Sequence, residues 1–303
     1  MSICRRPRAE LRPFVSLLWA TDGGPTPAAG ACHELVLPSG AMHLSIRLGD
    51  SPVRLFKGSD QRATDLGTAV IGGVRESAFR KEVAGQRGSV GAMLWPGVAE
   101  LLSNTPAGAL AHRHTRLDDI WDHSWLAEVK ERLEATSTSE NRMLVLEEVL
   151  ARRLPRVRGV DALIAHMLAR LDQGSRVSDI VRESGFSHRY LARTFTQAVG
   201  IPPKSYQRLR RFNRALDHLH RSATMSLAEV AAAHRYADQA HMSREFLRFT
   251  GLTPGNYRRI APADARHVVI PNDVVGGQLC SIRDGTRRAD RPGNNQENSL
   301  VRP

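Results

Sequence analysis

Residues 185–206 read GFSHRYLARTFTQAVGIPPKSY, and residues 235–257 read RYADQAHMSREFLRFTGLTPGNY. A shift of 51 residues aligns the two segments, and six positions then agree in chemical character. The aligned pairs are Leu191 and Met242, Arg193 and Arg244, Phe195 and Phe246, Gly200 and Gly251, Pro203 and Pro254, and Tyr206 and Tyr257. Upstream, a shift of 50 residues pairs Ile180 with Val230, Val181 with Ala231, and Phe186 with Tyr236. Because apolar, glycine and proline positions recur in order, the pattern indicates two copies of one structural unit.

The first copy carries the local signals of a helix-turn-helix unit. Gly185 lies just beyond the end of a short predicted helix, where a left-handed residue is favoured. Ser187 is a suitable N-cap for the next helix, on which Tyr190 or Leu191, together with Phe195, can face the core. The side chains left on or beside the open face of that helix are His188, Arg189, Ala192 and Arg193.

The second copy repeats this anatomy. Ser226 can cap a helix over residues 227–233, and Asp238 can cap a second helix that begins near Gln239. The predicted inner face of that second helix carries Met242, Phe246 and Phe249. The predicted outer face carries Gln239, His241, Arg244 and Arg248.

A longer helix is predicted between the two copies, starting near Pro203. Its apolar stripe consists of Tyr206, Leu209, Phe212, Leu216 and Leu219. Its other face carries Lys204, Arg208, Arg210, Arg211 and Arg214. Such a linker helix can hold two recognition helices in a fixed relation, so that they enter successive major grooves, which repeat every ~34 Å.

These residues resemble the AraC/XylS family of transcription regulators. The first motif of the family is matched by Gly185-Phe186-Ser187 with Leu191, Arg193 and Phe195. Its C-terminal signature is matched by Asp238-Gln239, Ser243-Arg244, Phe246, Gly251, Thr253-Pro254 and Tyr257-Arg258. The resemblance covers roughly residues 157–260 and implies a seven-helix DNA-binding domain that activates or represses transcription. The family usually has glycine in the second turn, where this sequence has Arg235. Arginine there must adopt a left-handed conformation, or the turn must shift, at a cost of about 1 kcal/mol.

The predicted DNA interface contains two groups of residues. Candidates for base-edge contact are His188, Arg189, Ala192, Arg193, Gln239, His241 and Arg244. Candidates for phosphate contact are Ser187, Lys204, Arg208, Arg211 and Arg248. The alternative for Arg193 and Arg244 is a salt bridge that braces the unit, and the alternative for the others is a solvated helix face. Because its turn and cap residues are in place, the first unit is expected to read sequence, and the second to contribute mainly affinity.

The distribution of charge supports a polyanionic partner for one segment only. The chain of 303 residues has a net charge of +12, yet residues 1–155 contain 19 basic and 18 acidic side chains. Residues 156–260 contain 18 basic and 8 acidic side chains, and residues 261–303 contain 6 and 5. A basic block beside a nearly neutral one indicates a polyanionic partner for that block.

The N-terminal part is predicted to be an α+β domain, a sheet or barrel followed by helices. Strands are expected at residues 33–37, 43–47, 53–56, 68–71, 78–83 and 90–95, with glycine and proline between them. A helical pattern follows Pro96, including an apolar row of Trp125, Val129 and Leu133. The predicted organisation is therefore a sensor-like or dimerisation-like domain over residues 1–155, an all-α double helix-turn-helix domain over 156–260, and a disordered tail over 261–303.

Residues 1–155 also resemble the N-terminal domain of one AraC-like subgroup. The matching pieces are Leu37-Pro38-Ser39-Gly40, Trp95-Pro96-Gly97 and Leu117-Asp118-Asp119-Ile120-Trp121. In the family this domain senses a ligand or forms a dimer, and the sequence does not separate these roles. The candidate partners are double-stranded DNA, a small-molecule effector, RNA polymerase and a second copy of the chain.

Other functional classes find little support in the sequence. Cys4, Cys32 and Cys280 have no paired spacing, which argues against a disulfide framework and against the zinc site of an alkylation-repair methyltransferase. His112 and His114 are spaced by two but lack further ligands at a useful distance, so no metal is expected. We therefore expect a non-enzymatic protein without a cofactor. The lack of an apolar run of ~20 residues, or of a signal peptide, favours a cytoplasmic protein that does not associate with membranes.

Overall fold

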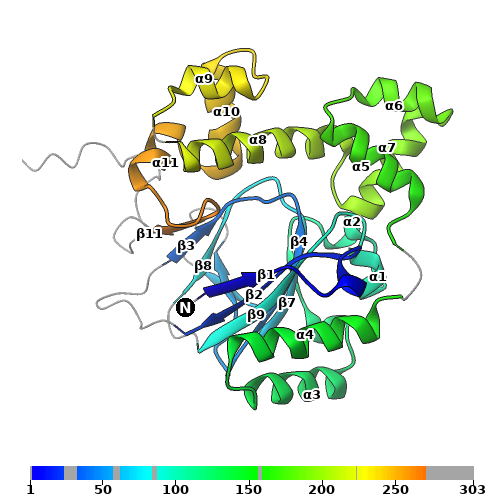
Figure 1. Cartoon of the computed structure of the whole chain (residues 1–303), viewed down its shortest axis with the longest axis vertical. Helices are drawn as coiled ribbons and strands as arrows, with labels where there is room; N and C mark the ends of the chain where they lie inside the picture. The colour runs from blue at the N-terminus through cyan, green and yellow to red at the C-terminus, as the bar shows by residue number, and fades with distance from the viewer. Residues whose placement is uncertain are drawn as a thin grey trace, which may run out of the picture.

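The computed structural model describes residues 2–23, 33–56, 62–83, 87–155, 159–222 and 224–270. Its N-terminal half is built on two antiparallel sheets with helices below them, and its C-terminal half is helical (Figure 1). This arrangement confirms the predicted order of an α+β domain followed by an all-α domain.

The first sheet has the strand order β1-β2-β9-β4-β7-β10, and the second has the order β11-β3-β8-β5-β6. In the first sheet the strands are β1 (Ser2–Arg5), β2 (Val15–Asp22), β9 (Gly88–Leu94), β4 (Met42–Arg47), β7 (Ala69–Gly72) and β10 (His114–Arg116). In the second they are β11 (His267–Ile270), β3 (His33–Val36), β8 (Phe79–Glu82), β5 (Arg54–Phe56) and β6 (Ala63–Asp65). Strands β3, β4, β5, β7, β8 and β9 lie where the sequence predicts them, whereas the other five were not predicted.

Alternation along the strands divides the first sheet into an apolar face and a polar face. In β4, Leu44 and Ile46 are fully buried in the main core, while His43 and Ser45 line a cavity on the opposite face. In β2, Leu18 is likewise in the core and Trp19 lines the cavity. The apolar face packs on α4, and the second sheet forms the far wall of the cavity.

The helices of the N-terminal half are α1 (Ala99–Ser103), α2 (Ala107–Leu110), α3 (His123–Glu134) and α4 (Ser139–Arg153), with 3-10 turns at Ala9–Leu11 and Leu117–Asp119. Of the predicted row on α3, Val129 and Leu133 are buried and Trp125 is partly buried. Glu147 of α4 is also buried, where it accepts hydrogen bonds of 2.9 Å from the Arg5 guanidinium and thereby ties β1 to the helix layer.

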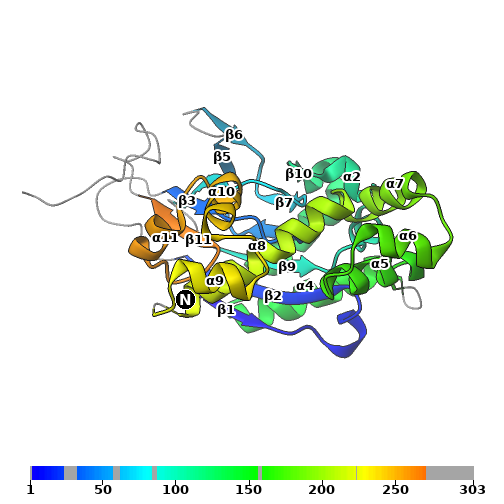
Figure 2. The ribbon, with the colours of Figure 1, turned by 90° about the horizontal axis from the view of Figure 1, so that it is seen from above.

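Seven helices occur in the described residues between 159 and 270, which agrees with the domain that the resemblance implied. They are α5 (Ala162–Asp172), α6 (Val177–Ser184), α7 (His188–Val199), α8 (Pro203–Arg221), α9 (Leu227–Ala233), α10 (Gln239–Thr250) and α11 (Pro254–Ile260). All five residues of the predicted stripe on α8 are buried. Helix α8 runs between the α5–α7 group and the α9–α11 group, with α7 and α10 near its opposite ends (Figure 2).

The two halves of the chain are in direct contact. Asn213 Nδ2 on α8 donates to the carbonyl oxygen of Pro38 at 3.1 Å, and the backbone N–H of Ala78 donates to the carbonyl oxygen of Phe249 at 2.8 Å. At the other end, α2 packs on α7, where a Cβ on Gly108 would lie 3.1 Å from the carbonyl oxygen of Thr196.

The prediction of a disordered tail after residue 260 is wrong for its first part. Strand β11 pairs with β3, and Arg266 forms an ion pair of 2.9 Å with Asp217 on α8. The order of this segment comes from its pairing with β3, which is far away in the sequence, and the segment has no apolar periodicity that would predict a strand. Residues 271–303, the remainder of the predicted tail, lie outside the described residues.

Candidate nucleic-acid interface

The first helix-turn-helix unit consists of α6, a turn and α7. Gly185 ends α6 with a left-handed backbone (φ 71°), and Ser187 Oγ accepts a hydrogen bond of 3.2 Å from the backbone N–H of Tyr190. Both features were predicted from the sequence. Leu191 and Phe195 are buried, which orients the opposite face of α7 outward.

The outward face of α7 includes an aromatic residue, Tyr190, for which the sequence allowed a core position. Of the two alternatives for the core position, Leu191 occupies it, whereas Tyr190 is 39% exposed. Its ring stacks on Phe186, with the centroids 4.9 Å apart. The sequence contains a signal for this stacked pair, because residues at i and i+4 are neighbours when the backbone between them is helical or nearly so.

The second unit consists of α9, a turn and α10. A capping box starts α9: Ser226 Oγ accepts from the N–H of Glu229, and Glu229 Oε2 accepts from the N–H of Ser226. Asp238 Oδ1 accepts a hydrogen bond of 2.6 Å from the N–H of His241 and caps α10. Met242 and Phe246 of α10 are buried as predicted.

Arg235 adopts the left-handed conformation, with φ 57°, at the position where the family usually has glycine. The N–H of Tyr236 donates to the carbonyl oxygen of Ala231, and the N–H of Arg235 donates to that of Ala232. These two bonds form a Schellman motif, the arrangement that a glycine turn produces. Of the two predicted outcomes, the strained arginine is therefore observed and the turn is not shifted.

Most of the predicted base-contact residues are accessible. His188, Arg189, Arg193, Gln239 and Arg244 are exposed, while Ala192 and His241 are partly buried. The ring of His241 packs edge-on against Tyr236, with centroids 5.4 Å apart. Within the described residues, no ion pair or side-chain hydrogen bond engages the side chains of Arg193 and Arg244, so the bracing salt bridge considered for them is absent there.

Two arginines of the linker helix have an acidic partner that the sequence did not predict. Arg208 and Arg211, expected to contact phosphates, both pair with Glu245 on α10, at 2.6 Å and 2.8 Å. Glu245 is only 3% exposed; burial raises its pKa, but the two guanidiniums outweigh this effect and hold the pKa below its ordinary value. The cations of α8 thus neutralise a buried carboxylate, a role that could not be recognised before α10 was placed beside α8.

The other residues of the predicted phosphate set lie on the surface. Lys204, Arg248 and Ser187 are exposed, although the hydroxyl of Ser187 is already the N-cap of α7. Arg210 and Arg214, on the same face of α8, lie 2.9 Å and 4.0 Å from Asp172 Oδ1 on α5.

Two further features of the described residues bear on the class of protein. They contain no cluster of three or more His, Cys, Asp or Glu side chains that could hold a metal ion. None of the helices in these segments combines the length and apolar character needed to cross a bilayer.

Comparison with known protein families identifies two regions. Residues 180–260 match the model of a helix-turn-helix domain, and residues 5–116 match a domain of unknown function, DUF6597. The first region contains both recognition helices, α7 and α10, and the second contains nearly all strands of the two sheets.

Two curated proteins, both described as regulators, are similar to part of this chain. The F1 operon positive regulatory protein of Yersinia pestis is 41% identical over 81 residues, 27% of this chain and 27% of that protein. YkgA of Escherichia coli, described as an HTH-type transcriptional regulator, is 28% identical over 112 residues, 37% of this chain and 46% of that protein. The chain thus spans less than half the length of either relative. The solved structure of ToxT from Vibrio cholerae has a TM-score of 0.41 and 10% identity, covering 78% of this chain and 98% of that chain.

Proposed function

We propose that this protein is a sequence-specific transcription regulator of the AraC/XylS type, because residues 180–260 match the model of a helix-turn-helix domain. It inserts α7 and α10 into successive major grooves of double-stranded DNA. The exposed arginines of these two helices carry the proposal, because Arg193 and Arg244 have no acidic partner among the described residues.

The linker helix supports the proposed spacing. A helix of 19 residues, such as α8, is about 28 Å long. This length is close to the ~34 Å repeat of the major groove, so units fixed near its two ends can reach neighbouring grooves. The ion pairs of Glu245 with Arg208 and Arg211 hold α10 on α8.

We assign different tasks to the exposed residues. His188, Arg189, Ala192 and Arg193 lie in the first half of α7, and Gln239, His241 and Arg244 in the first half of α10, so these would face the base edges. Lys204, Arg248 and Ser187 would contact phosphates, whereas Arg208 and Arg211 are committed to Glu245.

Selection of binding sites from a random-sequence DNA library, followed by footprinting, tests the proposal. The expected result is a site with two protected major-groove segments about one helical turn apart. Arg193→Ala should remove base preference in one segment, whereas Arg244→Ala should mainly weaken binding. Arg152→Ala, an exposed position on α4, is the matched control for loss of one charge. Recovery of no preferred sequence would contradict the proposal.

The N-terminal half is assigned a regulatory role under the same proposal. Residues 1–155 would transmit an effector signal or form a dimer, and RNA polymerase would be a further partner of the DNA-bound protein. Neither role requires catalysis, and under the same proposal the protein acts in the cytoplasm.

A further inference from the structure

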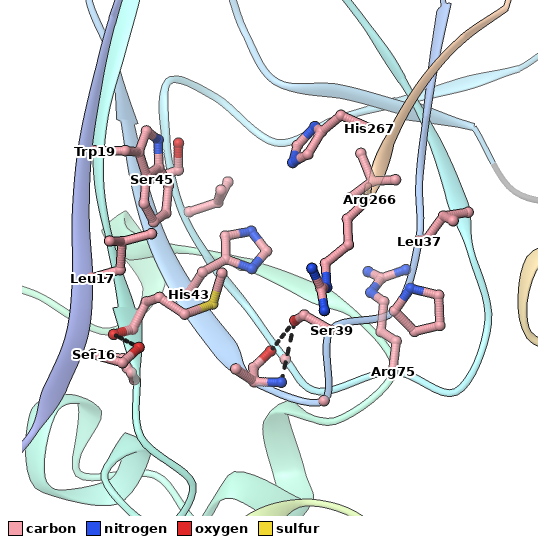
Figure 3. A pocket seen from close by; sticks show the side chains of 18 of the residues that line it. Ser16, Leu17, Trp19, Leu37, Ser39, His43, Ser45, Arg75, Arg266 and His267 are labelled. Carbon is pink, nitrogen blue, oxygen red and sulfur yellow. Dashed lines mark hydrogen bonds between the residues drawn. The ribbon is translucent and has the colours of Figure 1, made fainter. Parts of the chain in front are cut away.

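A cavity of about 1150 Å³ lies between the two sheets of the N-terminal half. Helices α5 and α8 contribute Leu168 and Tyr206 to its wall, and the segment around β11 contributes Arg266 and His267. Figure 3 shows Trp19 and Ser45 on one wall, Arg75 and Arg266 on the other, and His43 between them. Its size of about 1150 Å³ is slightly above the range of cavities that hold small organic ligands, ~300–1,000 Å³.

Two strand glycines make room for the rings of this cavity. A Cβ on Gly72 would lie 2.2 Å from His43 Cε1, and a Cβ on Gly91 would lie 2.1 Å from Trp19 Cζ2. Both distances are far below van der Waals contact, so any other residue would displace the ring. The local sequence therefore preserves space for His43 and Trp19 on the polar face of the sheet.

Several charged groups of the cavity wall neutralise one another. Glu34 lies 2.6 Å from Lys81 Nζ and 2.8 Å from His267 Nδ1. Arg266 pairs with Asp217, outside the cavity wall, at 2.9 Å. Arg47 donates hydrogen bonds to two backbone carbonyl oxygens. These groups already have partners and are less available to a ligand.

Arg75 differs from these groups. Within the described part of the chain, no carboxylate lies within ion-pair distance of its guanidinium, and its Nε atom is buried without a hydrogen-bond partner. The guanidinium lies 4.7 Å from the centre of the Phe79 ring, and Nη2 donates to Nδ1 of His114. A half-buried, permanently charged guanidinium without a carboxylate partner is stabilised when an anion in the cavity pairs with it.

Two histidines beside Arg75 can add neutral donors. The rings of His43 and His114 are 5.2 Å apart, and His114 also packs on Phe79 at 4.7 Å. Burial, with the nearby charges of Lys81 and Arg75, lowers the pKa of His43 to about 4, and burial likewise lowers the pKa of His114. Because Nδ1 of His114 accepts from Arg75, the proton of the neutral ring resides on Nε2.

The rest of the wall is largely apolar. Leu17, Trp19, Val70, Phe79 and Met93 line the cavity from four strands. A ligand that fills it therefore needs a hydrophobic body in addition to a polar group that matches Arg75.

We propose that this cavity binds an organic carboxylate with a hydrophobic body, whose anionic group is held by Arg75 and receives hydrogen bonds from His43 and His114. The hydrophobic body lies against Trp19 and Met93. The cavity wall includes residues of α5 and α8, so a bound ligand would contact the helical half. A regulatory effect of the ligand on DNA binding therefore rests on the proposed function. Binding of the ligand itself does not rest on the proposed function.

Thermal unfolding of the full chain with matched acids and amides tests the proposal. The probes are benzoate, 4-phenylbutyrate and decanoate at millimolar concentration, each compared with its uncharged amide. A ligand that binds only the folded protein raises Tm with increasing concentration. At least one acid is expected to raise Tm while its amide has a much smaller effect. Equal shifts for every acid and amide, or no shift with any acid, would overturn the proposal.

Variants then assign the response to Arg75. Arg75→Gln should weaken binding of the responding acid at least about tenfold, because a charge-assisted hydrogen bond is lost. Arg113→Ala, an exposed position outside the cavity wall, is the matched control and should respond like wild type. Should Arg75→Gln fail to fold, Arg75→Lys keeps the charge but loses the planar fork, and a clear reduction in affinity is still expected. An unchanged response in the variant that folds would contradict the assignment.

The same titration in the presence of DNA separates this inference from the proposed function. Ligand binding without any change in DNA affinity would leave the carboxylate site standing and contradict its regulatory role. A protein that binds no DNA but responds to acids through Arg75 would contradict the proposed function alone.

Discussion

The carboxylate of Glu245 on α10 accepts a hydrogen bond of 2.6 Å from Nε of Arg208 on α8. Arg211 completes the coordination from the same helix, and its guanidinium lies 4.3 Å from the ring centre of Tyr236. A recognition helix is thus attached to the linker helix by a buried, charged contact as well as by apolar packing.

Replacing Glu245 with glutamine should destabilise the protein by about 2 kcal/mol. The change leaves two guanidiniums without their anion, and the usual cost of breaking a buried pair, 3–5 kcal/mol, is reduced because both arginines are about 30% exposed. Urea unfolding measures the difference, and Glu128→Gln on the exposed face of α3 is the control. A variant as stable as this control would show that the contact contributes no stability.

Salt dependence should distinguish the exposed arginines from the paired ones. Each phosphate contact adds about 0.9 to the slope of log affinity against log salt concentration. Arg248→Ala is expected to lower this slope by roughly one such step, because Arg248 is exposed on α10. Arg210→Ala should leave the slope nearly unchanged, since that guanidinium lies 2.9 Å from Asp172. Equal changes for the two variants would argue against the proposed assignment.

The two turns should respond to substitution with opposite signs. Gly185→Ala places a Cβ on a left-handed residue and should cost about 1 kcal/mol, with no steric contribution because no atom lies within 4 Å of that Cβ. Arg235→Gly removes the same strain and should raise stability by up to about 1 kcal/mol. Denaturant midpoints measure both effects. A less stable Arg235→Gly protein would mean that the arginine side chain contributes more than its backbone costs.

Acid should destabilise the N-terminal half through His43. Its pKa is about 4 in the folded protein, against an ordinary value of 6.5, so the unfolded chain binds more protons between these pH values. The contribution of neutral His43 is fully present above pH ~6.5 and is lost as the pH falls toward ~4, amounting to about 2 kcal/mol by pH ~5. Lys81, Arg75 and His267 add to the cost of a charged imidazole there.

Urea unfolding across this pH range measures the effect. His43→Gln should show a shallower dependence on pH than wild type, because it removes one group that takes up a proton on unfolding. The same slope in both proteins would assign the acid sensitivity to other groups.

The sequence was most informative where structure is set by neighbours along the chain. Gly185, Ser187, Ser226 and Asp238 act within one turn of themselves, and each occupies the position that its residue type predicted. The outward orientation of Arg193 and Arg244 follows from the helical period, which the apolar positions define.

Features that depend on distant segments were not predictable in this way. Strand β2 has no regular apolar alternation in the sequence, because a bulge between Val15 and Leu17 shifts which residues face the core. His114 was considered together with His112, two residues away, whereas its actual neighbours are His43 and Arg75. The ion pair of Arg208 with Glu245 joins two helices that are 37 residues apart in the sequence, and no local pattern indicates it.

Strand β11 has a mechanical consequence for the helices that precede it. The chain leaves the sheet domain after α4, forms all seven helices of the second half, and then returns to pair with β3. The helical half is therefore an insertion anchored at both ends, and it cannot rotate freely about a single tether as a terminal domain on a linker can. Restricting the orientations available before DNA arrives lowers the rotational entropy that binding must remove.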